Sequence, residues 1–225
     1  MATIVITGAN RGIGLELARQ YAAAGDTVIR AMRGADKAAS PIGTTMTLDV
    51  TSDESAAEFA AALGSRPVDL LINNAGVVGP ARQSGTDMDF PGFLATLDAN
   101  VLGPLRVTQA LLPNLRQAKG AKIAVISSRM GQLARQGFGG RSGHVAYRSS
   151  KTAVNKVFQC LAADLEEEGI AVAMLHPGWV RTDMGGPGAD IDVTTSAEGI
   201  RTVLGNLSPA RSGRFWAYDG EELDW

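Results

Sequence analysis

A tyrosine precedes a lysine by four positions in the stretch "YRSSK", which runs from Tyr147 to Lys151. Positions i and i+4 of a helix share a face, so the ammonium can lie beside the phenol. A free tyrosine has a pKa of about 10 and is a poor proton shuttle near neutrality. An ammonium about 6 Å away, at an effective dielectric of about 20, would lower that pKa by about two units. The spacing therefore predicts that Lys151 tunes Tyr147 for proton transfer.

Three glycines, Gly8, Gly12 and Gly14, occur in the stretch "TGANRGIG", between a predicted strand and a predicted helix. Glycines there allow a tight turn and a close approach of the backbone to phosphate groups. The free amides and the dipole of a helix N-terminus then attract those phosphates. An ordinary glycine-rich turn has a similar composition. The position between the first strand and the first helix nevertheless predicts nucleotide binding.

The elements that must position these residues alternate along the chain. Short apolar runs such as "TIVIT", "TVIRAM", "DLLINNAG", "KIAVISS" and "IAVAMLHPG" are separated by helical stretches, the longest at about 93–118 and 145–168. This alternation is typical of βαβ units with a parallel sheet. We see no linker or repeat. We therefore expect residues 1–225 to form a single α/β domain, a doubly wound Rossmann fold of about seven parallel strands with helices on both faces.

The spacing Gly-x-x-x-Gly-x-Gly, followed by "NNAG" at 73–76, a serine pair at 127–128 and then "YRSSK", resembles the short-chain dehydrogenase/reductase family. The four motifs stand in the family's order and at the expected strand ends, and the resemblance covers about 4–184. The forms "YRSSK", "PGWVRTDMGG" and "DGEELDW" are similar to the small members related to bacterial C-factor and to insect carbonyl reductase. The resemblance implies an NAD(P)-dependent oxidoreductase.

The resemblance also implies a catalytic role for each of four residues. Tyr147 would be the general acid and base, and Lys151 would also bind the nicotinamide ribose. Ser128 would polarise the substrate oxygen, and Asn100 would hold a water in the proton relay behind the lysine. The expected reaction is hydride transfer between a nicotinamide and a small-molecule carbonyl, a ketone, diketone or quinone, with reduction to a secondary alcohol or the reverse. The alternative is that Ser128 and Asn100 have no catalytic role. Ser128 would then only hydrogen-bond the backbone at the end of a strand, and Asn100 would be an amide inside a helix.

Arginines near the end of the second predicted strand bear on the choice of cofactor. Arg33 ends that strand, Arg30 is nearby and Arg11 lies in the glycine turn. Guanidinium groups suit a 2′-phosphate, which favours NADP(H). NAD(H) would bind instead if the arginines were solvated and Asp36 reached the ribose. The resemblance implies these cofactor-binding residues: Gly8, Asn10, Arg11, Gly12, Ile13, Gly14, Arg33, Asp49, Val50, Asn74, Ala75, Gly76, Tyr147, Lys151, Pro177, Gly178, Val180 and Thr182.

Composition and charge argue against several other classes of function. The 225 residues carry 21 basic and 23 acidic side chains, and no run of one sign could follow a nucleic-acid backbone. The chain shows neither a secretory signal nor a membrane-spanning run, so we expect a cytoplasmic protein. His144 and His176 lack further ligands at a usable spacing, so we predict no metal. Cys160 falls among apolar residues at helical spacing, which predicts core packing.

Some features leave alternatives open. The gap between Ser128 and Tyr147 is longer than in most members of the family and lies beside the expected substrate cleft. Candidates for substrate contact there are Gln132, Leu133, Phe138 and His144, unless the loop is solvated surface. Apolar positions in the two long helical stretches favour a homodimer or homotetramer. The resemblance to C-factor also allows a nucleotide-binding signalling protein with little turnover, although the four intact catalytic positions favour an enzyme.

Overall fold

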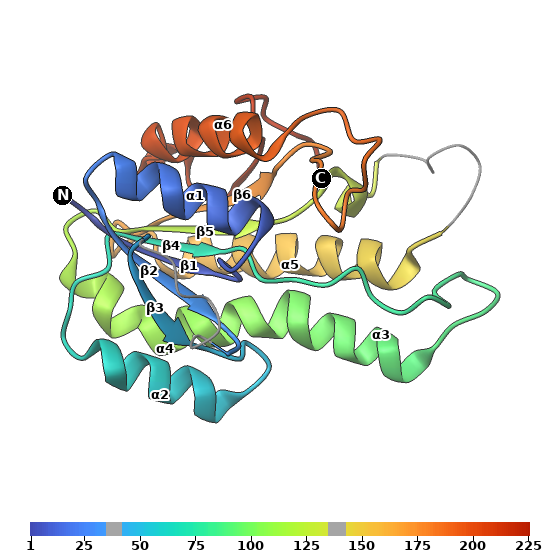
Figure 1. Ribbon diagram of the computed structural model, residues 1–225, viewed down its shortest axis with the longest axis horizontal. Coiled ribbons are helices and arrows are strands. Elements are labelled where there is room, and N and C mark those ends of the chain that lie inside the picture. The colour runs from blue at the N-terminus through green and yellow to red at the C-terminus, as the bar shows by residue number, and fades with distance from the viewer. Residues whose placement is uncertain (35–41, 135–142) are drawn as a thin grey trace.

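The computed structural model describes residues 1–34, 42–134 and 143–225 (Figure 1). Within these ranges the chain forms a seven-stranded sheet in the order β3-β2-β1-β4-β5-β6-β7, and every neighbouring pair is parallel. The predicted doubly wound fold of about seven parallel strands is confirmed. The strands are β1 (Thr3–Thr7), β2 (Thr27–Met32), β3 (Thr44–Thr47), β4 (Leu70–Asn73), β5 (Lys122–Ile126), β6 (Ala171–His176) and β7 (Arg214–Ala217).

Helices cover both faces of the sheet (Figure 1). The first and the last pack against each other on one face, and the others lie on the opposite face. None of the helices in the described ranges is long and apolar enough to cross a membrane. The helices are α1 (Gly12–Ala23), α2 (Asp53–Leu63), α3 (Phe90–Leu97), α4 (Gly103–Gln117), α5 (Val145–Asp164) and α6 (Val193–Gly205).

The sheet separates two apolar cores, because successive side chains of a strand point to opposite faces. On β1, Val5 joins the core that contains Leu111 of α4 and Phe158 of α5. Its neighbour Ile6 joins the second core, which contains Leu17 of α1. Since helices cover both faces, most residues of the central strands β1, β4, β5 and β6 are apolar, and this is why the sequence shows short continuous apolar runs there.

The long helical stretch expected at about 93–118 is interrupted by a change of helix type. After α3 the chain forms a π-helical turn at Asp98–Leu102 and then continues as α4. A π turn spaces its side chains differently from an α-helix and is frequent at functional sites. Asn100, one of the predicted catalytic residues, lies within this turn and is buried.

The prediction that Cys160 packs in the core is wrong, because its side chain is exposed. The buried face of α5 includes Val154, Phe158 and Leu161, which are four and three residues apart. Cys160 lies between the last two of these and points off that face. Apolar neighbours in sequence therefore gave the wrong orientation for this residue.

Arg30 is also not where either interpretation of the sequence put it. Only 1% of its surface is exposed, so it is neither a solvated charge nor available to a phosphate. Its Nε donates to the carbonyl of Ile42 at 2.7 Å, and its Nη2 donates to the hydroxyl of Thr45 at 2.8 Å. The strand continues beyond Arg30 to Met32, so this side chain belongs to the strand interior, where it links β2 to β3 and to the segment before it.

The buried arginine gives the first prediction. Arg30→Ala should lower the free energy of unfolding by about 2–4 kcal/mol, since it removes hydrogen bonds from a charged donor and leaves a cavity. Arg33→Ala is the matched control on an exposed residue and should change that free energy by no more than about 0.5 kcal/mol. Urea unfolding measures both values. Equal stability of the two variants would contradict the structural role of Arg30.

Candidate active site

The segments predicted to bind the cofactor and the predicted catalytic serine follow four neighbouring strands. The glycine turn follows β1, "NNAG" spans the end of β4, Ser128 comes after β5, and "PGWVRTDM" comes after β6. These strands are adjacent and parallel, so their carboxyl ends meet at one edge of the sheet. The strand order also reverses between β1 and β4, and ligands of open α/β sheets bind at such a switch point. The edge beside β1 and β4 is therefore the candidate site.

The glycine turn is joined directly to the "NNAG" segment. The hydroxyl of Thr7 accepts from the backbone amides of Asn74 and Ala75, each at 3.0 Å. In return, the Asn74 side-chain amide donates to the carbonyls of Thr7 at 2.9 Å and Gly8 at 3.2 Å. A Cβ at Gly14 would lie 2.4 Å from Nδ2 of Asn74. Packing within the protein alone therefore favours glycine at this position.

A third segment, from the loop after β6, reaches the same turn. Gly12 has a φ of +55°, which favours glycine, and a Cβ there would lie 3.5 Å from Cγ2 of Thr182. Arg11 forms an ion pair with Asp183, and both side chains are exposed. The loop is anchored behind by Ser196, whose hydroxyl donates to the carbonyl of Pro177 at 2.6 Å. Three loops therefore surround the N-terminus of α1.

Ser128, Tyr147 and Lys151 come together at the end of β5. Nζ of Lys151 donates to the carbonyl of Ile126, the last residue of β5, at 2.8 Å. The same nitrogen lies 5.5 Å from the centre of the Tyr147 ring. Ser128 is buried, close enough to the Tyr147 phenol to affect its pKa, and its hydroxyl accepts from the amide of Met130 at 3.1 Å. The helical spacing of Tyr147 and Lys151 therefore gives the close approach that the sequence predicted.

The pKa of Tyr147 departs from the predicted direction. Burial raises it above its ordinary value, while the neighbouring Ser128 side chain lowers it by less. Burial also lowers the pKa of the Lys151 ammonium to about 8. Both shifts have one cause, since a poorly solvated site disfavours the charged form of each group. In the protein without a cofactor, desolvation raises the pKa of Tyr147 by more than the positive charge of Lys151 was expected to lower it.

Asn100 holds the loop that follows β4. Its Oδ1 accepts from the amide of Val77 at 2.8 Å, and its Nδ2 donates to the carbonyl of Val77 at 2.9 Å. Nδ2 also donates to the hydroxyl of Ser150 on α5 at 2.9 Å. A Cβ at Gly76 would lie 3.1 Å from Oδ1 of Asn100 and 3.8 Å from Nζ of Lys151. The side chain of Asn100 therefore joins the loop after β4 to α5.

Comparison with known proteins agrees with this geometry. A family model described as short chain dehydrogenase matches residues 2–190. The chain belongs to the short-chain dehydrogenase family. The C-signal protein of Myxococcus xanthus is 46% identical over 167 residues, which are 74% of this chain and 98% of that protein.

Two further relatives cover nearly the whole chain of this dehydrogenase family member. The 1-hydroxy-2-glutathionyl-2-methyl-3-butene dehydrogenase of Rhodococcus sp. (strain AD45) is 37% identical over all of both chains. The crystal structure of NADPH-bound carbonyl reductase from chicken fatty liver superposes with a TM-score of 0.92 at 32% identity, and covers 100% of this chain and 99% of that one. The resemblance found in the sequence motifs is confirmed.

The other predicted cofactor residues of this dehydrogenase chain lie at the same edge. Arg33 follows β2 and is exposed, while Asp36 lies outside the described residues. Asp49 accepts from the amide and the hydroxyl of Thr51 at 2.9 and 2.7 Å, and these bonds hold its pKa below the ordinary value. Val50 packs against Gly103 at the start of α4, where a Cβ would lie 3.0 Å from Cγ2 of Val50.

The predicted substrate-contact residues are only partly described. Phe138 lies outside the described residues, and Leu133 is 79% exposed. Gln132 donates to the carbonyl of Asp224 at 2.7 Å, so its side chain is tied to the C-terminal segment. His144 is exposed and has a φ of 64° at the start of α5.

Two buried polar residues at the site were missed in the sequence. Ser150 is fully buried and accepts from Asn100, and Gln83 is buried in the loop between β4 and α3. Ser150 is three residues from Tyr147 on the same helix, and this spacing was the available signal. Gln83 lies in "PARQSG", a loop without periodicity, so no pattern in the sequence indicated its role.

The lowered pKa of Lys151 gives the second prediction. Between its folded value of about 8 and the ordinary value of 10.5, the unfolded chain binds more protons than the folded chain. The free energy of unfolding should therefore rise with pH in this window. From about pH 7 to about pH 9.5, the wild type should gain about 2 kcal/mol relative to Lys151→Met, whose side chain does not titrate. Urea unfolding at both pH values measures this, and parallel pH dependence would contradict it.

Proposed function

We propose that this chain is an NADPH-dependent carbonyl reductase that reduces a ketone, diketone or quinone, with residues 1–225 acting as one catalytic domain. The observation that carries the proposal is the meeting of Ser128, Tyr147 and Lys151 at the end of β5, at the sheet edge that also carries the glycine turn. Membership of the dehydrogenase family and the likeness to a carbonyl reductase support it.

The glycine turn fits a dinucleotide. Gly8 and Gly12 have φ values of +65° and +55°, and the segments at 74–76 and 177–182 lie beside the turn. We assign the 2′-phosphate to Arg33, because Arg11 is already paired with Asp183 and Arg30 is buried. The chicken carbonyl reductase holds NADPH, which favours NADP(H) over NAD(H). When bound, the cofactor supplies the hydride.

Tyr147 is the proposed proton donor. Because burial raises the pKa of its phenol, Tyr147 is protonated at neutral pH, and this is the form that a carbonyl reduction needs. The hydroxyl of Ser128 accepts from the amide of Met130 and interacts with the Tyr147 phenol. When a substrate oxygen lies beside the phenol, we assign the hydrogen of Ser128 to that oxygen. One hydride and one proton then convert C=O to CH–OH. Asn100 acts by holding Val77, since its side-chain amide is occupied by protein groups.

The loops around the site expose apolar side chains. Val77 follows β4, Leu133 follows β5, and Trp179 and Met184 follow β6, with exposed fractions of 40, 79, 53 and 53%. Leu133, Trp179 and Met184 are each more than half exposed. Exposing large apolar side chains to water costs free energy, and contact with an apolar ligand would offset that cost. They favour a carbonyl substrate with bulky apolar or aromatic substituents over a small aliphatic ketone.

The second candidate function is signalling with little turnover. The 46% identity to the C-signal protein of Myxococcus xanthus favours it. The presence of Asn100, Ser128, Tyr147 and Lys151 favours the reductase, because burying a lysine beside a tyrosine is costly and such groups with shifted pKa values are concentrated at catalytic sites.

The experiment that tests the proposal is the loss of NADPH absorbance, and separately of NADH absorbance, with a panel of quinones, diketones, aryl ketones and aliphatic ketones. We expect NADPH oxidation with the bulkier substrates. Tyr147→Phe should lower turnover at least about a hundredfold and leave NADPH affinity within about twofold, because it removes a general acid and little binding surface. Unchanged turnover in Tyr147→Phe would exclude Tyr147 as the donor. Cofactor binding without any oxidation would favour the signalling candidate.

Cofactor preference gives a further prediction. Arg33→Ala should weaken NADPH binding about tenfold and NADH binding less than about twofold, because only NADPH carries the 2′-phosphate. Titration of cofactor fluorescence measures both affinities. Arg19→Ala, on the exposed surface of α1, is the control and should alter neither. Equal losses for the two cofactors would show that Arg33 does not contact the phosphate.

A further inference from the structure

Helix α5, which carries Tyr147 and Lys151, begins without a side-chain cap of its own. The residue before its first turn, His144, has a φ of 64° and makes no capping hydrogen bond. The first N–H groups of a helix have no partner within the helix and need acceptors from elsewhere. Tyr147 is the third residue of α5, so the groups that accept from these N–H groups also determine how the first turn holds Tyr147.

Gln83, from the loop between β4 and α3, supplies two of those acceptors. Its backbone carbonyl accepts from the amide of Val145 at 2.9 Å, and its side-chain Oε1 accepts from the amide of Tyr147 at 3.2 Å. Gln83 is 7% exposed. Its two carbonyl oxygens thus cap the first turn of α5 from a segment more than sixty residues earlier in the chain.

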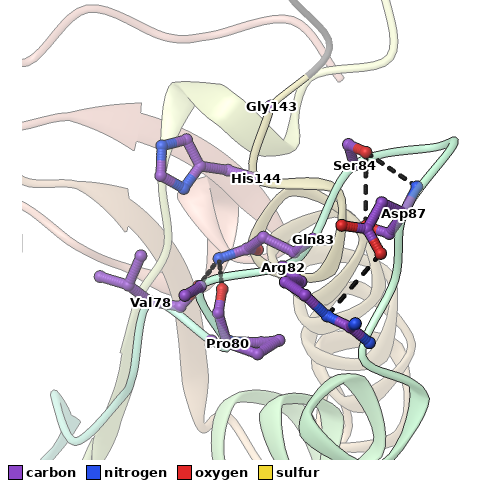
Figure 2. A pocket seen from close by; sticks show the side chains of 10 residues that line it. Val78, Pro80, Arg82, Gln83, Ser84, Asp87, Gly143 and His144 are labelled. Carbon is purple, nitrogen blue, oxygen red and sulfur yellow. Dashed lines mark hydrogen bonds and ion pairs between the residues drawn. The ribbon is translucent and has the colours of Figure 1, made fainter.

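The other end of the Gln83 amide is held as firmly. Nε2 donates to the carbonyl of Val78 at 3.1 Å and to that of Pro80 at 2.8 Å (Figure 2). These residues follow Val77, which Asn100 holds by both of its backbone groups. The loop 77–83 is therefore tied to the π turn at one end and to α5 at the other. It also lines a cavity of about 430 Å³ together with Gly143 and His144.

We propose that Gln83 is a positioning residue for the proton donor: its amide fixes the first turn of α5, and with it the phenol of Tyr147, relative to the loop after "NNAG". This inference rests on the proposed role of Tyr147. A misplacement of about 1 Å in a reacting group costs about a hundredfold in rate, so a frayed first turn would slow proton transfer. A residue that served only stability would leave the rate of the folded enzyme unchanged.

The chain offers a matched control in Asn114, near the end of α4. Asn114 is 3% exposed, its backbone carbonyl accepts from Val68 at 3.1 Å, and its Nδ2 donates to the carbonyls of Gly64 and Arg66 at 2.7 and 2.9 Å. It therefore clamps a loop in the same way as Gln83, but before β4, at the opposite edge of the sheet from Tyr147.

The test compares Gln83→Met with Asn114→Leu, each a replacement of similar size that removes the amide. Both variants should lower the melting temperature. Only Gln83→Met should lower kcat, by about tenfold, with the Kd for NADPH within about twofold of wild type. In a Tyr147→Phe background, Gln83→Met should lower kcat by no more than about twofold further, because the donor it positions is already gone.

Several outcomes would overturn the inference. One is a kcat for Gln83→Met that matches that of Asn114→Leu, and another is the same tenfold loss in the Tyr147→Phe background. If Gln83→Met does not fold, amide hydrogen exchange of the wild type decides: an unprotected Tyr147 amide would refute the contact, and protection like that of Val154 within α5 would support it. Equal turnover by wild type and Tyr147→Phe would instead refute the proposed function, and this inference with it.

Discussion

A buried ammonium at the carboxyl end of β5 is the interaction on which the candidate site depends. Lys151 is 6% exposed, and its donation to the carbonyl of Ile126 offsets part of the cost of removing its charge from water. A buried charge is costly unless it is paired or hydrogen-bonded, so the site needs this contact to be maintained. Gly131 packs directly on the backbone of Lys151, where a Cβ would lie 2.7 Å from its carbonyl carbon, and a Cβ at Gly76 would lie 3.8 Å from its Nζ. The position of Lys151 therefore depends on the end of β5 and on the loops after β4 and β5.

Hydrogen bonds from amide side chains hold several of these loops in position. Asn74, Asn100 and Gln83 each bind main-chain atoms of a neighbouring segment, and the last two use both their donor and their acceptor. An amide side chain can pair with a backbone much as another strand would, in places where the sheet has ended. These contacts join the glycine turn to the segment after β4, and that segment to the π turn and to the first turn of α5.

The sequence predicted the strands and loops that form the site better than it predicted the contacts of the individual buried side chains. Parallel strands and their loops follow from apolar periodicity and glycine positions, and a spacing of four residues brought Lys151 to Tyr147 as expected. The burial of Arg30 could not be predicted, because the sequence pattern of a strand is identical whether its arginine side chain faces solvent or a neighbouring strand. The π turn at Asn100 was hidden because apolar positions keep a nearly helical period across it. Gln83 acts through a loop that has no pattern at all.

Desolvation has a larger effect on the pKa of Tyr147 than the charge of Lys151, and for this reason the predicted direction was wrong. The prediction weighed one charge at about 6 Å, worth about 3 kcal/mol at an effective dielectric of about 20. Desolvation, which sequence does not reveal, acts on both groups and shifts buried pKa values by up to about 3–5 units. It raises the pKa of Tyr147 and lowers that of Lys151 to about 8, so at neutral pH the phenol keeps its proton. Proton donation to a carbonyl oxygen, the role proposed for Tyr147, requires this protonated state, and burial supplies it without any help from Lys151.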